Sequence, residues 1–175
     1  MAEYDLVGNN PAKGNTRVLP SGATLKLLTR ALFDDEADVA SSGSPTVLAT
    51  NSIAADTLIS NGGTIHARYF GIMAANANER SLTLKFAGTT IFNQLYDETT
   101  QITWAIDCTI IRESSSAVKC FVTIMIPAVY PLMTYTRITS LNLTSNAYNL
   151  ELTADQTSNA DVTFKFSKGT YTPGI

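Results

Sequence analysis

Residues 102–126 read ITWAIDCTIIRESSSAVKCFVTIMI, and this stretch decides the fold. Apolar residues occupy every second position on both sides of the polar run Glu113–Ser116. A period of two is typical of β-strands that bury one face. The stretch therefore predicts a β-hairpin whose two apolar faces stack on one side and form the centre of the core. The alternating positions are Ile102, Trp104, Ile106, Cys108 and Ile110 before the turn, and Val118, Cys120, Val122, Ile124 and Ile126 after it.

The pairing of the two strands follows from the loop. A turn over Glu113–Ser116 predicts a register in which Cys108 faces Cys120 and Trp104 faces Ile124. Two cysteines in this position could be crosslinked, but cross-strand neighbours fit disulfide geometry poorly, which favours free thiols. Neither cysteine lies in a CxxC or Cys/His spacing, so the sequence predicts no metal ligands here.

The same period continues through most of the chain beyond Thr46. Clusters of turn residues interrupt it every eight to fifteen residues, the spacing expected of a sandwich or barrel. About nine strands are predicted, and two antiparallel sheets packed face to face bury such half-apolar strands most simply. The predicted strands cover residues 46–51, 64–73, 80–87, 89–95, 101–113, 117–126, 135–144, 147–154 and 161–167.

The first part of the chain has a different pattern. Residues 1–44 are rich in Gly, Pro and Asn breakers, which indicates an arm and not a core. Leu25, Leu28 and Leu32 recur at helical spacing, so the arm is expected to be extended or partly helical. The predicted organisation is an N-terminal arm over residues 1–44 and one β-sandwich domain over residues 45–175.

Composition excludes several classes of partner. The formal net charge is -3 and the 12 Lys and Arg residues are scattered, so there is no basic stripe for nucleic acid. No apolar run approaches the ~20 residues that span a bilayer, and the start of the chain lacks a signal-peptide pattern. We therefore expect a protein made in the cytoplasm that binds neither nucleic acid nor membrane.

Few residues are candidates for catalysis or metal binding. His66 is the single histidine, and a Ser-His-Asp triad using it would need a nucleophilic serine, but no GxSxG elbow is present. The acidic run of Asp34, Asp35, Glu36 and Asp38 could hold Ca²⁺, yet it lacks the alternating spacing of a calcium loop, which favours a solvated patch or a contact with a basic neighbour. The sequence predicts no enzyme, no cofactor and no metal.

Aromatic side chains and the histidine have a second interpretation. Tyrosines can stack on sugar rings, but they are equally favoured at protein interfaces, and no repeating aromatic platform is visible. The candidate interface residues are His66, Tyr130 and Tyr135.

Several segments together resemble a recurrent domain of tailed-bacteriophage structural proteins, over about residues 46–125. The Trp104–Arg112 segment resembles that family's W-x-I/L-x-x-x-I-I-R strand. The other segments are Ala49–Ile53, Asp56–Gly62, Gly71, Ala74–Asn78 and Leu82–Phe92.

This resemblance implies an all-β, antiparallel β-sandwich of jelly-roll type that assembles as homotrimers on the virion. We expect a non-enzymatic capsid cement or decoration protein that binds the major capsid protein or another virion protein and stabilises the shell. The alternative is a receptor- or carbohydrate-binding module of a head or tail fibre. Head, neck and tail locations all remain open. In the cement hypothesis the arm grips neighbouring subunits through Leu6, Val7, Val18, Leu19 and Leu25.

Overall fold

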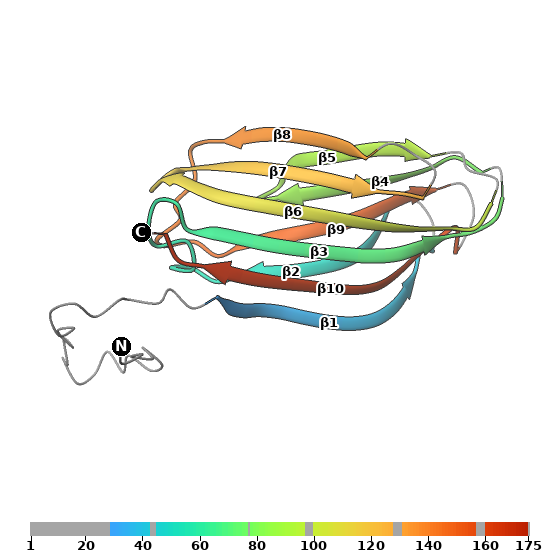
Figure 1. Cartoon of the computed structure of the whole chain (residues 1–175), viewed down its shortest axis with the longest axis horizontal. Helices are drawn as coiled ribbons and strands as arrows, with labels where there is room; N and C mark the ends of the chain where they lie inside the picture. The colour runs from blue at the N-terminus through green and yellow to red at the C-terminus, as the bar shows by residue number, and fades with distance from the viewer. Residues whose placement is uncertain are drawn as a thin grey trace, which may run out of the picture.

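The computed structural model describes residues 29–42, 45–76, 78–96, 100–127, 131–156 and 160–174. These residues form ten strands and no helix, and so include no helix that could cross a bilayer (Figure 1). The strands are β1 (Arg30–Ala40), β2 (Thr46–Ile53), β3 (Thr64–Met73), β4 (Arg80–Phe86), β5 (Thr89–Tyr96), β6 (Ile102–Ser114), β7 (Ala117–Met125), β8 (Leu132–Ile138), β9 (Tyr148–Gln156) and β10 (Val162–Thr172).

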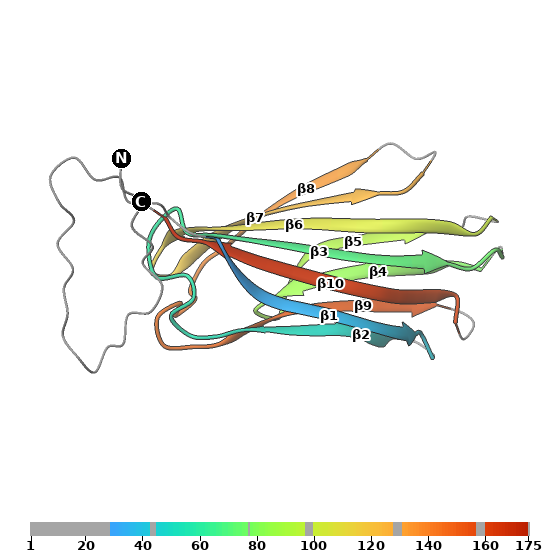
Figure 2. The same ribbon diagram turned by 60° about the horizontal axis from the view of Figure 1, so that its bottom comes forward.

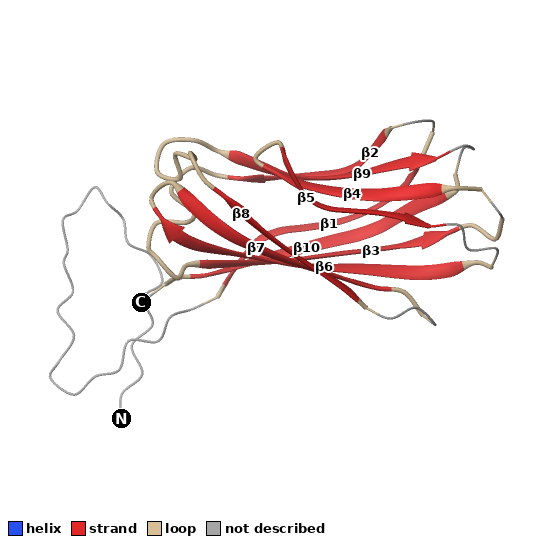
Figure 3. Cartoon of the chain, turned by 90° about the horizontal axis from the view of Figure 1, so that it is seen from above, coloured by secondary structure: helices blue, strands red, loops and turns tan. Residues whose placement is uncertain are grey.

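The strands form two antiparallel sheets packed face to face (Figure 3). One sheet has six strands in the order β1-β10-β3-β6-β7-β8, and the other has four in the order β2-β9-β4-β5. The chain changes sheet at each connection except β4–β5 and the meander β6–β7–β8. Without β7 and β8, this strand order is that of an eight-stranded jelly roll, a double sheet built from two Greek keys. The all-β sandwich predicted from the sequence is confirmed, and β7–β8 is a hairpin added to one edge.

The central hairpin buries the predicted face. The apolar side chains on this face of β6 and β7, from Trp104 to Ile110 and from Val118 to Ile124, are at most 3% exposed. The predicted register is wrong by two residues, because Cys108 pairs with Val122 and Cys120 pairs with Ile110. The two strands extend to a tight turn at Ser115–Ser116, with a bulge just before it. A slip of two residues keeps every side chain on its own face, which is why the core prediction survives the register error.

The main difference from the sequence prediction is β1. Residues 30–40 pair with β10 as an edge strand of the six-stranded sheet, although the sequence placed them in the arm. Leu32, part of the possible helix, lies in this strand. Register shifts between Ala31 and Phe33 and between Glu36 and Val39 break the alternation of apolar residues. A bulge adds one residue to a strand and interrupts the alternation of its side chains, so such a strand does not show a period of two.

The segment predicted as a strand over residues 135–144 also differs. Strand β8 ends at Ile138, and the chain then forms a loop in which Leu143 is buried. The backbone N–H groups of Leu141 and Leu143 donate to the carbonyl oxygens of Ser116 and Ser115. Alternating leucines here cover the β6–β7 turn and do not extend a sheet.

One close approach holds β3 and β6 in register. Gly71 pairs with Trp104, whose indole is 1% exposed. A Cβ at position 71 would overlap the Trp104 ring and the carbonyl oxygen of Thr163. Only glycine leaves room for the indole at this pair.

We predict that Gly71→Ala lowers the free energy of unfolding by about 1–3 kcal/mol, because the added methyl group overpacks the core. Urea denaturation followed by Trp104 fluorescence measures the effect. The matched control is Thr103→Ala, an exposed neighbour on β6 that should stay within about 0.5 kcal/mol of the parent. Equal stability of the two variants would contradict the close packing of Gly71 on the indole.

Candidate functional site

The outer face of the six-stranded sheet carries an apolar row. Phe166 pairs with Phe70, Phe70 with Ala105, and Ala105 with Met125, so these four side chains lie side by side across β10, β3, β6 and β7. The rings of Phe70 and Phe166 are stacked with centroids 5.4 Å apart. A sheet face meant only for water would carry polar side chains at these positions.

A charged row lies one step along the strands. Arg68 and Asp107 form a two-pronged ion pair, with Nε–Oδ1 at 3.1 Å and the second nitrogen, Nη2, 3.4 Å from Oδ2. The Nζ of Lys168 lies 3.5 Å from Oδ2 of Asp34 on β1. All four side chains are about half exposed, so these pairs contribute little to stability and leave a face with balanced charge.

A third row contains two of the predicted interface residues. His66, Thr109, Phe121 and Tyr135 are successive pairing partners across β3, β6, β7 and β8. The Nδ1 of His66 lies 3.1 Å from Oγ1 of Thr109, and the rings of Phe121 and Tyr135 are 5.1 Å apart. The fold thus brings His66 and Tyr135 onto one face. Tyr130 and the candidate arm contacts Leu6, Val7, Val18, Leu19 and Leu25 lie outside the described residues.

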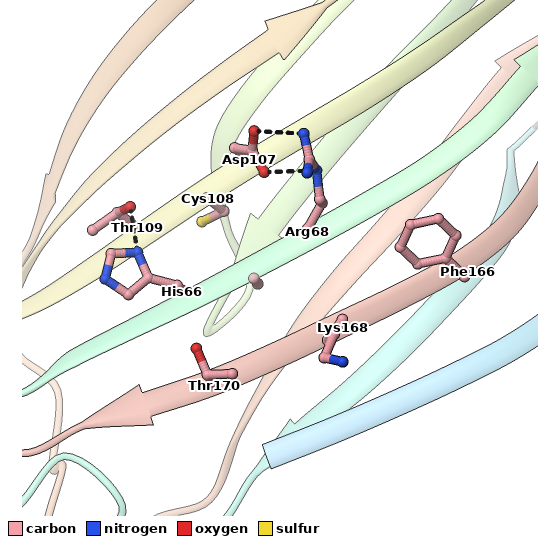
Figure 4. A pocket seen from close by; sticks show the side chains of 9 residues that line it. His66, Arg68, Asp107, Cys108, Thr109, Phe166, Lys168 and Thr170 are labelled. Atoms are coloured by element: carbon pink, nitrogen blue, oxygen red, sulfur yellow. Dashed lines mark hydrogen bonds and ion pairs between the residues drawn. The ribbon is translucent and has the colours of Figure 1, made fainter. Parts of the chain in front are cut away.

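A cavity of about 470 Å³ opens on this face over β10, β3 and β6 (Figure 4). His66, Arg68 and Lys168 offer hydrogen-bond donors, Asp107 offers acceptors, and threonine hydroxyls offer both. The Asp107 carboxylate is bound to Arg68 and does not orient the imidazole. Among the described residues, His66 therefore does not form the Ser-His-Asp arrangement left open by the sequence. The remaining lining comes from Ala67, Cys108, Thr109, Phe166 and Thr170.

A second, apolar groove of about 360 Å³ follows the apolar row. Its lining includes Phe70, Ala105 and Met125 of the apolar row together with Pro127 and Pro131. Beyond it, Met133 is 69% exposed and Tyr135 is 55% exposed on β8. Of these residues, only Tyr135 was singled out from the sequence. In the sequence, the exposed apolar surface was indicated only by Phe121 and Met125, which occupy the otherwise polar face of β7.

The acidic cluster of β1 faces lysines. Asp38 Oδ2 lies 2.7 Å from the Nζ of Lys165, and Asp34 pairs with Lys168. Within the described part of the chain, no three His, Cys, Asp or Glu residues are grouped so as to hold a metal ion.

Both cysteines are free and buried, in agreement with the thiol interpretation. Burial raises the pKa of Cys108 well above its usual value, with smaller contributions from Cys120 and Asp107. Burial likewise raises the pKa of Cys120 to about 12. The reactive thiolate is therefore disfavoured at both positions.

Comparisons with known proteins give little. No family model and no curated protein matches the chain. Among solved structures, it is similar to the alginate lyase from Klebsiella pneumoniae at 9% sequence identity, with a TM-score of 0.26. The match covers 63% of this chain and 57% of the lyase, so the chain spans little more than half of that protein. A likeness of this size carries no conclusion about function.

We predict that a disulfide reagent at about pH 8 labels neither cysteine of the folded protein but labels both in denaturant, because only the thiolate reacts.

Raised thiol pKa values also make the protein alkali-sensitive. Unfolded thiols ionise near 9.0 while folded ones stay protonated, so stability is full below that pH and falls as the pH rises above it.

Absorbance of the released thiol chromophore follows the labelling, and urea midpoints at about pH 7 and pH 10 follow the stability. Rapid labelling of the native protein, or an equal midpoint at both pH values, would contradict this burial.

Proposed function

We propose that this protein is a non-enzymatic structural component of a virion, a homotrimeric cement that binds the major capsid protein or another virion protein and stabilises the shell. The observation that carries the proposal is the outer face of the jelly roll, where aromatic and methionine side chains are exposed beside paired charges. Exposed apolar patches rimmed by polar groups mark surfaces that bind other proteins. The resemblance of residues 46–125 to tailed-bacteriophage structural domains supplies the virion context.

The charges of this face support assembly. Glu113 accepts a hydrogen bond from Nε of Arg137 at 2.5 Å and pairs with Lys119 at 3.3 Å, and these contacts lower its pKa. With Arg68 bound to Asp107, the cations of the central strands already have partners on the same face. Such a face can be buried in an interface without leaving a charge unpaired. A buried, unpaired charge is the main electrostatic cost of forming an interface.

The stretch before β1 is suited to be the second contact. The chain enters the sandwich at Arg30, and residues 1–28 of the sequence precede the described part. A segment of that length reaches at most roughly 100 Å when extended. A protein that binds only the assembled lattice stabilises it by mass action, and three linked copies multiply this effect.

A second candidate function rests on the polar cavity over β10, β3 and β6. Its mixture of fixed donors, fixed acceptors and hydroxyls suits a polyhydroxylated ligand, and the Phe166 ring at one end offers an apolar surface. This arrangement supports a receptor- or carbohydrate-binding module of a fibre.

For the cement proposal, deletion of residues 1–28 should leave a folded sandwich, because β1 is retained, but weaken binding to shells at least tenfold, about 1.4 kcal/mol. Co-sedimentation with shells that lack the protein measures binding, and circular dichroism reports folding. A full-length variant with Leu6, Val18 and Leu25 changed to serine tests the apolar contacts without shortening the chain. Normal decoration by the truncated protein would show that the arm is not the anchor.

For the second candidate, the isolated protein should bind members of a panel of neutral and carboxylated oligosaccharides. Arg68→Ala should then weaken binding about tenfold or more, since a charged hydrogen bond is lost. Lys85→Ala on the other sheet is the matched control, because Lys85 is also a partly exposed cation paired with a carboxylate, that of Glu151. Isothermal titration measures both variants. Equal affinities, or no binding to the panel, would reject this function.

A further inference from the structure

Strand β8 is an edge strand that exposes apolar side chains on both of its faces. It is the last strand of the six-stranded sheet, and its only pairing partner within the described residues is β7. On its outer side, Met133 and Tyr135 are more than half exposed. On its inner side, Leu132 is 40% exposed. Strand β8 therefore leaves apolar side chains on both faces and a row of backbone groups at its edge.

The narrower sheet explains why the inner side is open. The four-stranded sheet ends at β5, and the contact that joins β5 to β8 is a hydrogen bond of 3.0 Å from Oγ1 of Thr134 to the carbonyl oxygen of Ile91. Figure 2 shows β8 rising away from the body of the sandwich. The half of β8 that contains Leu132 and Met133 lies beyond this contact.

The opposite edge of the same sheet is different. Strand β1 carries four acidic side chains and two register shifts, which are common devices against pairing with another chain. Residues 132–138 of β8, LMTYTRI, contain one charge and no bulge in their pairing with β7. One edge of the sheet is protected and the other is not.

We propose that copies of this chain associate through the β7–β8 patch, defined as the outward-facing Phe121, Met125, Met133 and Tyr135 together with Leu132 on the inner side of the same edge. The proposal rests on the proposed self-association and narrows it to one surface. The occupant is a second copy because the patch holds no free charge: Glu113 already pairs with both Lys119 and Arg137 at its rim. An acidic or basic partner would gain no ion pair here, whereas the same patch on copies of this chain can be buried without leaving a charge unpaired.

The composition of the patch fits the centre of an interface. Aromatic residues and methionine are enriched there, and charged residues are confined to the rim. Association would cover the side chains of Met133 and Tyr135, and would also shield the unpaired edge of β8. The apolar groove along Phe70, Ala105 and Met125 continues the same surface toward the middle of the sheet.

The first test is the double variant Met133→Glu/Tyr135→Glu, compared with the parent by light scattering during gel filtration. The parent should run as an oligomer of the 18.8 kDa chain and the variant as a monomer. Its association should weaken at least 100-fold, because two carboxylates would be buried without partners. Ile59→Glu is the control, since Ile59 is 62% exposed away from the patch and its replacement should leave the oligomer intact.

The second test gives a positive signal that misfolding does not imitate. A thiol at Met133→Cys should be joined to that of a second copy by a short bis-maleimide, while Ile59→Cys should not be. Cys108 and Cys120 give little background because both are buried.

The outcomes separate the two proposals. An oligomer that persists in the double variant, with no crosslink at position 133, overturns this surface but leaves self-association standing. A parent protein that is monomeric in solution overturns both. Loss of the oligomer in the double variant alone, together with the specific crosslink, establishes the β7–β8 patch as the contact.

Discussion

A sheet of six strands packs on a sheet of only four, and this mismatch shapes the rest of the molecule. The jelly roll itself uses eight strands, four in each sheet, so β7 and β8 are additional strands of one sheet only. Strand β7 still buries its inner face, since Val118, Cys120 and Val122 are fully covered. Strand β8 buries Ile138 but leaves Leu132 40% exposed, because the four-stranded sheet ends at β5. The exposure of Leu132 is therefore a consequence of topology, whereas Met133 and Tyr135 are exposed because the sequence places apolar residues on the outer face of β8.

The sequence predicts the fold well where side chains alternate without interruption. Strands β3, β6 and β7 were placed almost to the residue, because a period of two reports directly which face is buried. The register of β6 and β7 was missed because a slip of two residues leaves that alternation unchanged. Strand β1 was missed for the opposite reason: two bulges disturb its alternation, and its partner β10 lies at the far end of the chain. Its pairing depends on Phe33 covering Gly169, a contact that no local pattern reveals.

The candidate site was predictable only in part. His66 and Tyr135 were chosen by residue type, and the fold places them in one row because β3, β6, β7 and β8 are neighbours. Met133 was not singled out, because a local pattern does not show that a strand lies at an edge beyond the opposing sheet. The ion pair between Arg68 and Asp107 depends on the β3–β6 register, which a single sequence does not determine.

The start of β1 and the β7–β8 patch lie on opposite edges of the same sheet. The N-terminal stretch enters through β1, whereas the β7–β8 patch lies at the other edge, roughly 24 Å away across five strand spacings. The strands between them are joined by continuous backbone ladders, and the loop before β4 is tied to the start of β10 by Asn76, which donates to Asp161 at 2.6 Å and accepts from buried Arg80 at 2.8 Å. In the proposed assembly, the patch at one edge contacts a second copy, while the N-terminal stretch that joins the sheet at β1 contacts the shell. The two contacts then do not compete for the same edge, as a subunit that joins a lattice through several contacts at once requires.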